Sequence, residues 1–241
     1  MRPAGAPRTA MVLAAGLGTR MRPLTDDRPK ALVEVGDKAL IDHMLDRLAK
    51  AGVTTAVVNV HAFADRLEAH LAQRAAAPKI VVSDERGELL ETGGGLKKAR
   101  PLLGDDPVYV ANIDAVWTED GVPALYAVAA AYDPAAMDAC LLLAPLERSL
   151  GFDGPGDMFL DGGRAAFRGE AASAPFAFAG VHIAKPSVVD GEPAGPFSLS
   201  KLWRAMAARG RLGAVVLDGF WMHVGDPRAR DEAQARLKAR S

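Results

Sequence analysis

Glycines and cationic side chains lie close together near the start of this chain. Residues 13–25 read LAAGLGTRMRPLT, and Pro29-Lys30 follows. The apolar run Met11–Ala15 leads into this segment. Glycine lets a backbone approach a polyphosphate closely, and arginine and lysine neutralise the phosphate charge. The spacing therefore indicates a site that handles a nucleotide.

The same spacing excludes two common nucleotide motifs. A dinucleotide fingerprint needs a third glycine three residues after the second, and Met21 stands there. A Walker loop needs Gly-Lys-Ser/Thr, which does not follow. The alternative, a glycine-rich turn with solvated arginines, would suit a lone pair of glycines. It explains less well two glycines combined with Thr19, Arg20 and Lys30 after a buried strand.

This segment resembles the loop of the sugar-1-phosphate nucleotidyltransferases, Gly-x-Gly-Thr-Arg-x-x-Pro-x-Thr followed by Pro-Lys. Three further features resemble the branch that acts on N-acetylmuramate-1-phosphate in peptidoglycan recycling: LETGGG at 90–95, Phe178-Ala179-Gly180 and the short length. The likeness runs from about Ala10 to the C-terminus. It implies that UTP and a sugar-1-phosphate are the substrates, a UDP-sugar and pyrophosphate the products, and Mg²⁺ the cofactor.

Two kinds of alternative remain open. The same chemistry could use mannose-1-phosphate with GTP or glucose-1-phosphate with dTTP. A protein of another class, a non-catalytic regulatory homologue that binds a nucleotide-sugar, is the second kind.

Composition sets broad limits on the protein. The chain has 241 residues, of which 49% are hydrophobic and 24% charged, and a formal charge of −1. These values are ordinary for a globular protein and give no support for a nucleic-acid or membrane partner. One cysteine excludes an intrachain disulfide, and no signal peptide is visible. We expect a cytoplasmic monomer or small homo-oligomer.

Short apolar runs alternate with segments of helical period, which predicts a Rossmann-like, three-layer α/β fold with a mainly parallel sheet. The expected strands are Met11–Ala15, Ala56–Val60, Ile80–Val82, Val108–Ala111, Leu141–Ala144 and Ala177–Ile183, with a hairpin at 158–168. The expected helices are Leu40–Ala51, Ala64–Ala75, Gly94–Leu102, Val122–Ala131, Leu199–Arg209 and Pro227–Ala239. Residues 1–9 are expected to be a flexible tail. Residues 10–241 form one domain, in which the resemblance assigns 10–145 to the nucleotide and 146–241 to the sugar phosphate.

Three residues are predicted to carry the chemistry. Lys30 and Arg20 suit phosphate groups. Asp114 follows the apolar run Val108–Ala111, at the strand end where ligands bind in such sheets, and could hold magnesium with substrate phosphates and water. The alternative role for Asp114 is a turn or helix cap.

Other residues are assigned mainly through the resemblance. For the nucleotide they are Leu13, Ala14, Ala15, Gly16, Gly18, Thr19, Arg20, Glu85, Thr92 and Gly93. For the sugar they are Glu91, Asn112, Asp157 and Gly180. The segment Glu91–Gly95 is expected to be a loop whose backbone amides meet the carbonyl oxygens of uracil.

His223 departs from the family pattern, in which an aspartate at this place supplies a second carboxylate to the metal. His223 is itself a candidate metal ligand, but an imidazole is a poor ligand for magnesium, so a direct bond ranks below contact with a phosphate or water and below simple packing. Three interpretations follow: His223 contacts a phosphate or water, Asp226 partly substitutes for the missing carboxylate, or His223 is a packed histidine. Asp226 before Pro227 is most simply the N-cap of the last helix.

Overall fold

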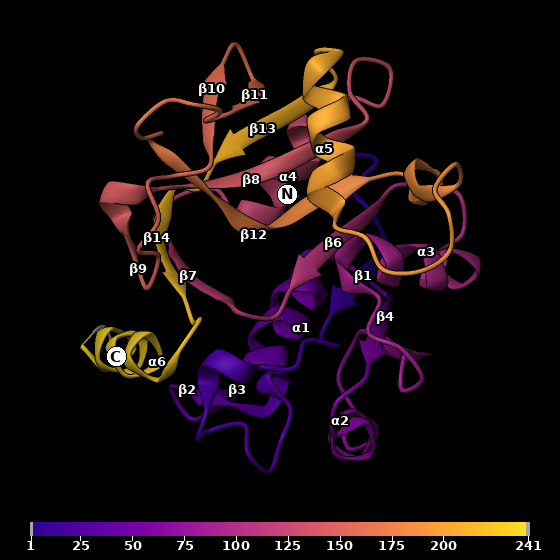
Figure 1. Cartoon of the computed structure of the whole chain (residues 1–241), viewed down its shortest axis with the longest axis vertical. Coiled ribbons are helices and arrows are strands. Elements are labelled where there is room, and N and C mark those ends of the chain that lie inside the picture. Colours follow the sequence, from indigo (N-terminus) through magenta and orange to yellow (C-terminus); the bar gives the residue numbers. More distant parts are fainter. Residues whose placement is uncertain (1, 240–241) are drawn as a thin grey trace.

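The computed structural model describes residues 2–239, which form a large central sheet with helices on both faces (Figure 1). The strand order is β10-β11-β13-β8-β12-β6-β1-β4-β5. The strands are β1 (Thr9–Leu13), β4 (Thr55–Val60), β5 (Lys79–Asp84), β6 (Val108–Asn112), β8 (Ala139–Pro145), β10 (Met158–Asp161), β11 (Arg164–Phe167), β12 (Phe176–Ala184) and β13 (Leu212–Val216). The four strands β5, β4, β1 and β6 run parallel, whereas β12 is antiparallel to both β6 and β8. The first half of the sheet is therefore parallel and the second half mixed.

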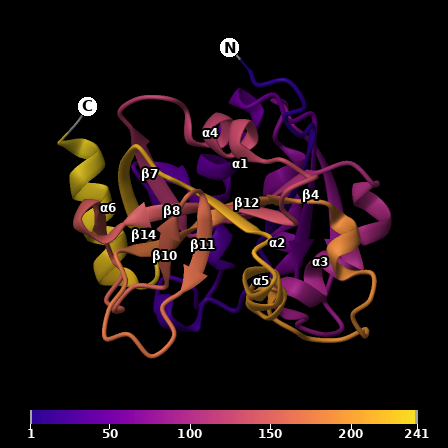
Figure 2. The same cartoon turned by 90° about the horizontal axis from the view of Figure 1, so that it is seen from above.

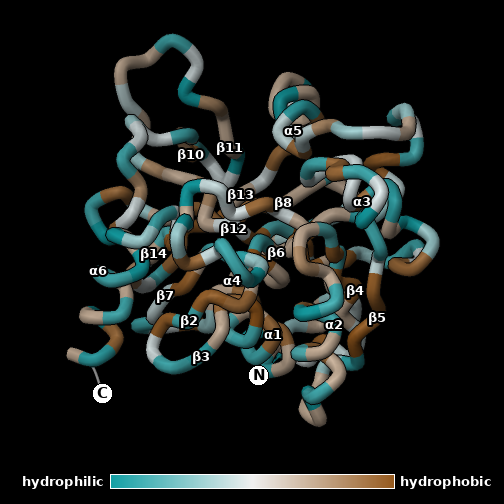
Figure 3. Tube along the Cα trace, turned by 60° about the horizontal axis from the view of Figure 1, so that its bottom comes forward, coloured by the Kyte–Doolittle hydropathy of each residue, from teal (hydrophilic) through white to brown (hydrophobic). Residues whose placement is uncertain are grey.

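Side chains of the central strands alternate between two hydrophobic cores, as the two-residue period of a strand requires. In β1, Ala10 and Val12 join one core and Met11 joins the other. Helices α1 (Leu40–Lys50), α2 (Ala64–Ala72) and α4 (Ala124–Ala131) cover the first core, and α3 (Glu91–Leu103) and α5 (Leu199–Ala208) cover the second. The three-layer α/β fold is confirmed. Figure 3 shows the hydrophobic stretches along the central strands.

Smaller elements extend the body on one side. A second sheet has the order β7 (Ala115–Glu119), β14 (Gly219–His223) and β9 (Ser149–Leu150), and α6 (Pro227–Lys238) contacts it. The views in Figures 1 and 2 place α6 and α3 at opposite ends of the molecule. The hairpin of β2 (Glu34–Val35) and β3 (Lys38–Ala39) and four 3-10 turns complete the chain, the turns being Thr19–Met21, Lys30–Leu32, Leu146–Arg148 and Pro186–Val189.

The beginning of the chain differs from the expected flexible tail. The carbonyl oxygen of Arg8 accepts hydrogen bonds from the amides of Thr54 and Thr55, at 2.8 and 3.2 Å, and Ala6 is buried. These bonds prolong the pairing of β1 with β4, so residues 6–9 are held against the body. Residue 1 lies outside the described residues. Among residues 2–239, no helix combines the length and apolar character needed to cross a membrane.

Candidate active site

The loop after β1 is held by a buried asparagine from the neighbouring strand. Asn59, near the end of β4, is only 2% exposed. Its Oδ1 accepts hydrogen bonds from the amides of Ala14 and Ala15, at 2.6 and 3.2 Å, and its Nδ2 donates one to Glu85 Oε1 at 2.9 Å. Our sequence interpretation missed Asn59. The signal was a polar residue at the carboxyl end of an otherwise apolar strand, where ligands bind in such sheets.

Gly18 allows the same loop to turn back toward Lys30. Its φ of +65° lies in the left-handed region, which favours glycine. A Cβ atom at this position would lie 3.1 Å from the Lys30 Cβ and from the Thr25 Cγ2. The Thr25 hydroxyl donates a hydrogen bond to the Gly18 carbonyl at 2.8 Å. The loop therefore packs closely against the residue that follows Pro29.

Lys30 and Asp114 form an ion pair at the carboxyl end of β6. The Lys30 Nζ lies 2.9 Å from Asp114 Oδ2, and both side chains are mostly buried. Asp114 occupies the two-residue connection between β6 and β7. Burial alone would raise the pKa of Asp114, but the nearby imidazole of His223 and the charge of Lys30 hold it far below its ordinary value. Asp114 is therefore an anion throughout the physiological range.

His223 is the third member of this cluster. Its Nε2 lies 3.6 Å from Asp114 Oδ2, and its Nδ1 lies 3.0 Å from the Gly151 carbonyl oxygen, to which it can donate. The ring stacks on Trp221 with centroids 5.5 Å apart. His223 is thus packed and also directed at the carboxylate. The Asp226 side chain accepts from the Ala229 amide at 2.8 Å, which confirms its role as the N-cap of α6 and makes it a poor substitute ligand.

The loop after β1, together with Lys30, Asn59 and Asp114, lines a cavity of about 400 Å³. Most of the predicted site residues line it: Leu13, Ala14, Ala15, Gly16, Gly18, Thr19, Arg20, Lys30, Glu85, Glu91, Thr92, Asn112 and Asp114. Gly93, Asp157, Gly180 and His223 are not part of its lining. Within residues 2–239, no carboxylate forms an ion pair with Arg20, which is exposed at the rim. An unpaired guanidinium beside Lys30 makes this wall suitable for an anion.

The segment Glu91–Gly95 is not a loop, so this expectation was wrong. It forms the first turn of α3. The amides of Gly93 and Gly94 donate to the Phe197 carbonyl oxygen, at 2.8 and 3.2 Å, and are therefore already paired. A Cβ atom on Gly93 would lie 2.3 Å from the Phe197 ring. These glycines serve close packing between α3 and the segment before α5.

Glu85 lies in the wall of the cavity and is fully buried. Its Oε1 accepts from Asn59, whereas its Oε2 has no partner among the described residues. Burial raises the pKa of Glu85 above its ordinary value, although the bond from Asn59 opposes the shift. Gly95 of α3 makes room for the hydrogen-bonded side chains of Glu85 and Asn59, because a Cβ atom on Gly95 would lie 2.9 Å from both Glu85 Oε1 and Asn59 Nδ2.

Two residues assigned to the sugar lie beyond this cavity. Asp157 Oδ2 accepts from the Phe178 amide at 3.0 Å, and Asp157 lines a separate cavity. Gly180 has a φ of +91° at an irregularity of β12. A Cβ atom on Gly180 would lie 3.6 Å from the Asn112 Cβ. Gly180 therefore packs beside Asn112, one of the residues that line the first cavity.

The residues fit a magnesium ion that arrives with a nucleotide. Among residues 2–239, no three His, Cys, Asp or Glu side chains form a complete metal centre. Magnesium needs only one or two protein carboxylates when phosphates and water supply its other ligands. Asp114 is an ionised carboxylate on the cavity wall and Asn112 lies beside it. Both offer the oxygen atoms that this ion prefers.

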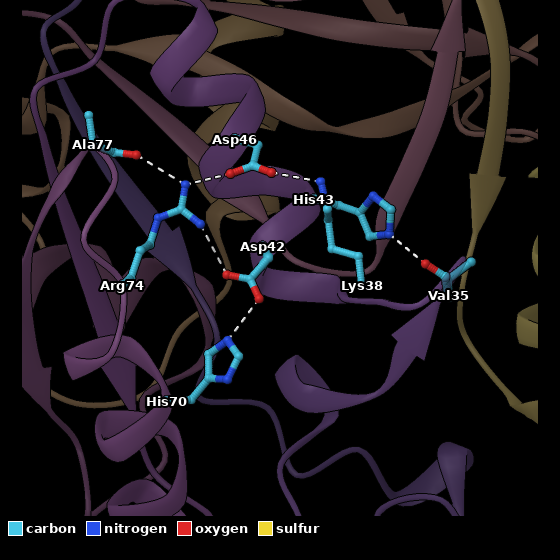
Figure 4. Close-up of polar contacts among 8 residues, drawn as sticks. All are labelled: Val35, Lys38, Asp42, His43, Asp46, His70, Arg74 and Ala77. Carbon is cyan, nitrogen blue, oxygen red and sulfur yellow. Dashed lines mark hydrogen bonds and ion pairs between the residues drawn. The ribbon is translucent and has the colours of Figure 1, made fainter.

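The histidines near the first two helices have structural partners. His70 Nε2 lies 2.8 Å from Asp42 Oδ2, and His43 Nε2 lies 2.7 Å from the Val35 carbonyl oxygen. Figure 4 shows both contacts as dashed lines. Arg74 joins Asp42 and Asp46 in the same view and so ties the region after α2 to α1. These contacts agree with packing roles and lie outside the active-site cavity.

Comparison with known proteins agrees with the geometry. The family model described as nucleotidyl transferase matches residues 9–152. An N-acetylmuramate alpha-1-phosphate uridylyltransferase of Caulobacter vibrioides is 60% identical over 96% of this chain and 98% of its own length. An enzyme of the same name from Neisseria meningitidis is 35% identical, with 94% and 96% covered.

More distant relatives share the architecture. A mannose-1-phosphate guanyltransferase of Neurospora crassa is 34% identical over 91% of this chain, but the match covers 61% of its length. A solved structure of UDP-glucose pyrophosphorylase with UDP-glucose is 17% identical, covers 97% of this chain and 99% of its own, and has a TM-score of 0.80. This likeness concerns the fold. The family match and the two uridylyltransferases that align over almost the whole of both chains show that the chain belongs to the nucleotidyl transferase family.

Proposed function

We propose that this chain makes UDP-N-acetylmuramate and pyrophosphate from UTP and N-acetylmuramate-1-phosphate. The observation that carries the proposal is the wall formed by the glycine loop, Arg20, Lys30 and Asp114 in a chain 60% identical to a uridylyltransferase of that name. The product belongs to peptidoglycan recycling in the cytoplasm. We place the triphosphate along the glycine loop and the sugar phosphate toward Asn112.

The reaction replaces one phosphate bond with another. An oxygen of the sugar-1-phosphate attacks the α-phosphorus of UTP, and the bond from that phosphorus to the bridging oxygen of pyrophosphate breaks. The attacking oxygen is already anionic, so no general base is required. Catalysis then depends on alignment of the two anions and on stabilisation of the charge that develops between them.

The residues of the site divide this work. Arg20 at the rim binds the β- and γ-phosphates with its forked donors. Lys30, held by Asp114, places its ammonium near the α-phosphate. Asp114 and Asn112 would hold magnesium, which neutralises phosphate charge when bound. Asn59 keeps the loop in the shape that receives the nucleotide.

Replacement of Asp114 tests this assignment. Asp114→Asn keeps the size of the side chain but removes its charge, so we expect turnover to fall by a factor on the order of a thousand. Pyrophosphate release from UTP and N-acetylmuramate-1-phosphate measures the effect. Asp106→Asn, at an exposed position, is the control and should match the unmodified protein. Near-normal turnover of Asp114→Asn would show that Asp114 is only a turn residue.

A further inference from the structure

A second cavity of about 330 Å³ lies between the β10–β11 hairpin, β12 and α5. The function proposed above does not yet use it. Six of its lining residues matter here: Asp157, Arg168, Phe178, Ser200, Trp203 and Arg204.

Two short stretches of chain lead from the second cavity to residues that line the active-site cavity. Phe178 lines it two residues before Gly180, which lies against Asn112 of the first cavity. Ser200 lines it one residue after Leu199, whose amide donates to the Thr92 Oγ1 at 2.9 Å. Thr92 and Asn112 both line the first cavity. A substrate held at Asn112 could therefore extend one substituent into the second cavity.

The second cavity carries an excess of positive charge. Arg168 donates from Nε to the Gly156 carbonyl at 3.1 Å and from Nη1 to the Ala171 carbonyl, so it is positioned without being neutralised. Arg204 lies over the Phe167 ring, 4.2 Å from its centroid. In the part of the chain that is described, neither arginine forms an ion pair with a carboxylate.

Two cations of the neighbouring elements, in contrast, are paired with carboxylates. Lys201 pairs with Glu192, and Arg209 pairs with Asp138. Asp157 is the one acidic residue of the lining, and its Oδ2 already accepts a hydrogen bond from the Phe178 amide. With one carboxylate and two guanidinium groups, the lining has a net positive charge that would favour a further anion.

Packed aromatic rings form another part of the lining. The rings of Phe178 and Trp203 are 4.6 Å apart, and His182 packs edge-on against Trp203 at 5.1 Å. Burial lowers the pKa of His182 to about 3, so this side chain is neutral and adds no charge. The cavity thus combines an apolar face with cationic groups, a pairing that suits a small group bearing both a methyl and a carboxylate.

We propose that the second cavity binds the lactyl group of N-acetylmuramate-1-phosphate, with Arg204 and Arg168 on its carboxylate and Trp203 against its methyl group. This group is the lactyl ether that distinguishes N-acetylmuramate from N-acetylglucosamine. Guanidinium groups form paired hydrogen bonds with carboxylates. The inference rests on the proposed function and assigns these residues to substrate specificity.

A charge-deleted substrate tests the inference. We compare kcat/KM for N-acetylmuramate-1-phosphate with kcat/KM for its lactyl amide, which has the same shape but no charge. The unmodified protein should prefer the acid about ten- to a hundredfold, the range for hydrogen bonds to a charged group. Arg204→Gln should reduce this preference at least fivefold, mainly through KM for the acid. Arg204→Lys should retain part of it.

Two further variants complete the design. Arg168→Lys preserves the charge where removal of the side chain could disturb the loop, and should keep most of the preference for the acid. Arg209→Gln removes a cation at the end of α5, outside the cavity, and should keep the full preference for the acid.

The outcomes separate this inference from the proposed function. An equal preference for the acid in the unmodified protein and Arg204→Gln would overturn the lactyl assignment while UDP-sugar synthesis stands. No preference in the unmodified protein would also overturn it. Absence of turnover with both compounds would refute the proposed function itself.

Discussion

At the scale of single residues, the site is organised around one ionised carboxylate. Asp114 pairs with Lys30 at 2.9 Å and faces His223 at 3.6 Å. Its neighbours offset the cost of burying its charge, so it remains ionised and available to a cation. His223 adds an imidazole, and no second carboxylate, to this pair.

His223 provides a prediction about magnesium. His223→Asp would add a hard oxygen ligand and a negative charge beside Asp114, so we expect a lower magnesium concentration for half-maximal rate. Titration of the initial rate with magnesium at saturating substrates measures this. His223→Asn is the control, because it removes the imidazole without adding charge and should not lower the requirement. An unchanged or higher requirement in His223→Asp would contradict the placement of the metal at Asp114.

Glu85 provides a prediction about pH and stability. Its pKa in the folded state lies above its ordinary value of 4.5, so the folded protein keeps a proton that the unfolded chain releases. The contribution of Glu85 to the free energy of unfolding therefore decreases as pH rises from about 4.5 through the raised pKa. Glu85→Gln removes this titration.

We accordingly expect Glu85→Gln to gain stability relative to the unmodified protein between pH 5 and pH 8. Each unit of pKa shift corresponds to about 1.4 kcal/mol. Denaturant unfolding at several pH values measures the difference. Glu88→Gln, nearby and exposed, should show no such trend. A difference that stays constant across this range for Glu85→Gln would contradict the raised pKa.

At the scale of elements, the sequence predicts the regular parts well. The apolar runs and helical periods identify β1, β4, β5, β6, β8 and β12 and all six helices, because each buries a continuous apolar face. Strands β7, β13 and β14 were missed. Strand β7 ends on the polar residues Thr118 and Glu119, and β13 and β14 contain or begin with a glycine, Gly213 and Gly219 respectively.

The glycine triplet at 93–95 shows why local patterns mislead. Consecutive glycines have low helix propensity, so the sequence favours a loop. In the structure they begin α3, because only residues without Cβ atoms fit against Phe197, Gly195 and the Asn59–Glu85 pair. The contacts with Gly195 and Phe197 join segments about a hundred residues apart, and no local pattern reports them.

This packing leads to a prediction for Gly93. A Cβ atom there would lie 2.3 Å from the Phe197 ring and 2.8 Å from the Phe197 carbonyl oxygen, which is backbone. Gly93→Ala should therefore displace the segment before α5 and reduce stability by about 1–3 kcal/mol, as overpacking does. KM for the sugar phosphate should rise as well. Gly87→Ala, at an open position, is the control. Unchanged stability and KM in Gly93→Ala would contradict the close packing described here.

At the scale of the whole molecule, two sets of elements meet around the active site. The parallel strands β1, β4 and β6 supply the nucleotide loop, Asn59 and Asp114 at their carboxyl ends. Strand β12, antiparallel to β6, brings Gly180 beside Asn112. Strand β12 thus connects the elements around the second cavity to the carboxyl end of β6 in the active site.

The central claim is the identity of those two substrates. Its most direct test is the steady-state rate of pyrophosphate release for UTP, GTP, CTP and dTTP, each with N-acetylmuramate-1-phosphate, N-acetylglucosamine-1-phosphate, mannose-1-phosphate and glucose-1-phosphate. We predict the highest kcat/KM for UTP with N-acetylmuramate-1-phosphate. An equal or higher value for GTP with mannose-1-phosphate, or no release from any pair by a protein that still binds a UDP-sugar, would contradict it.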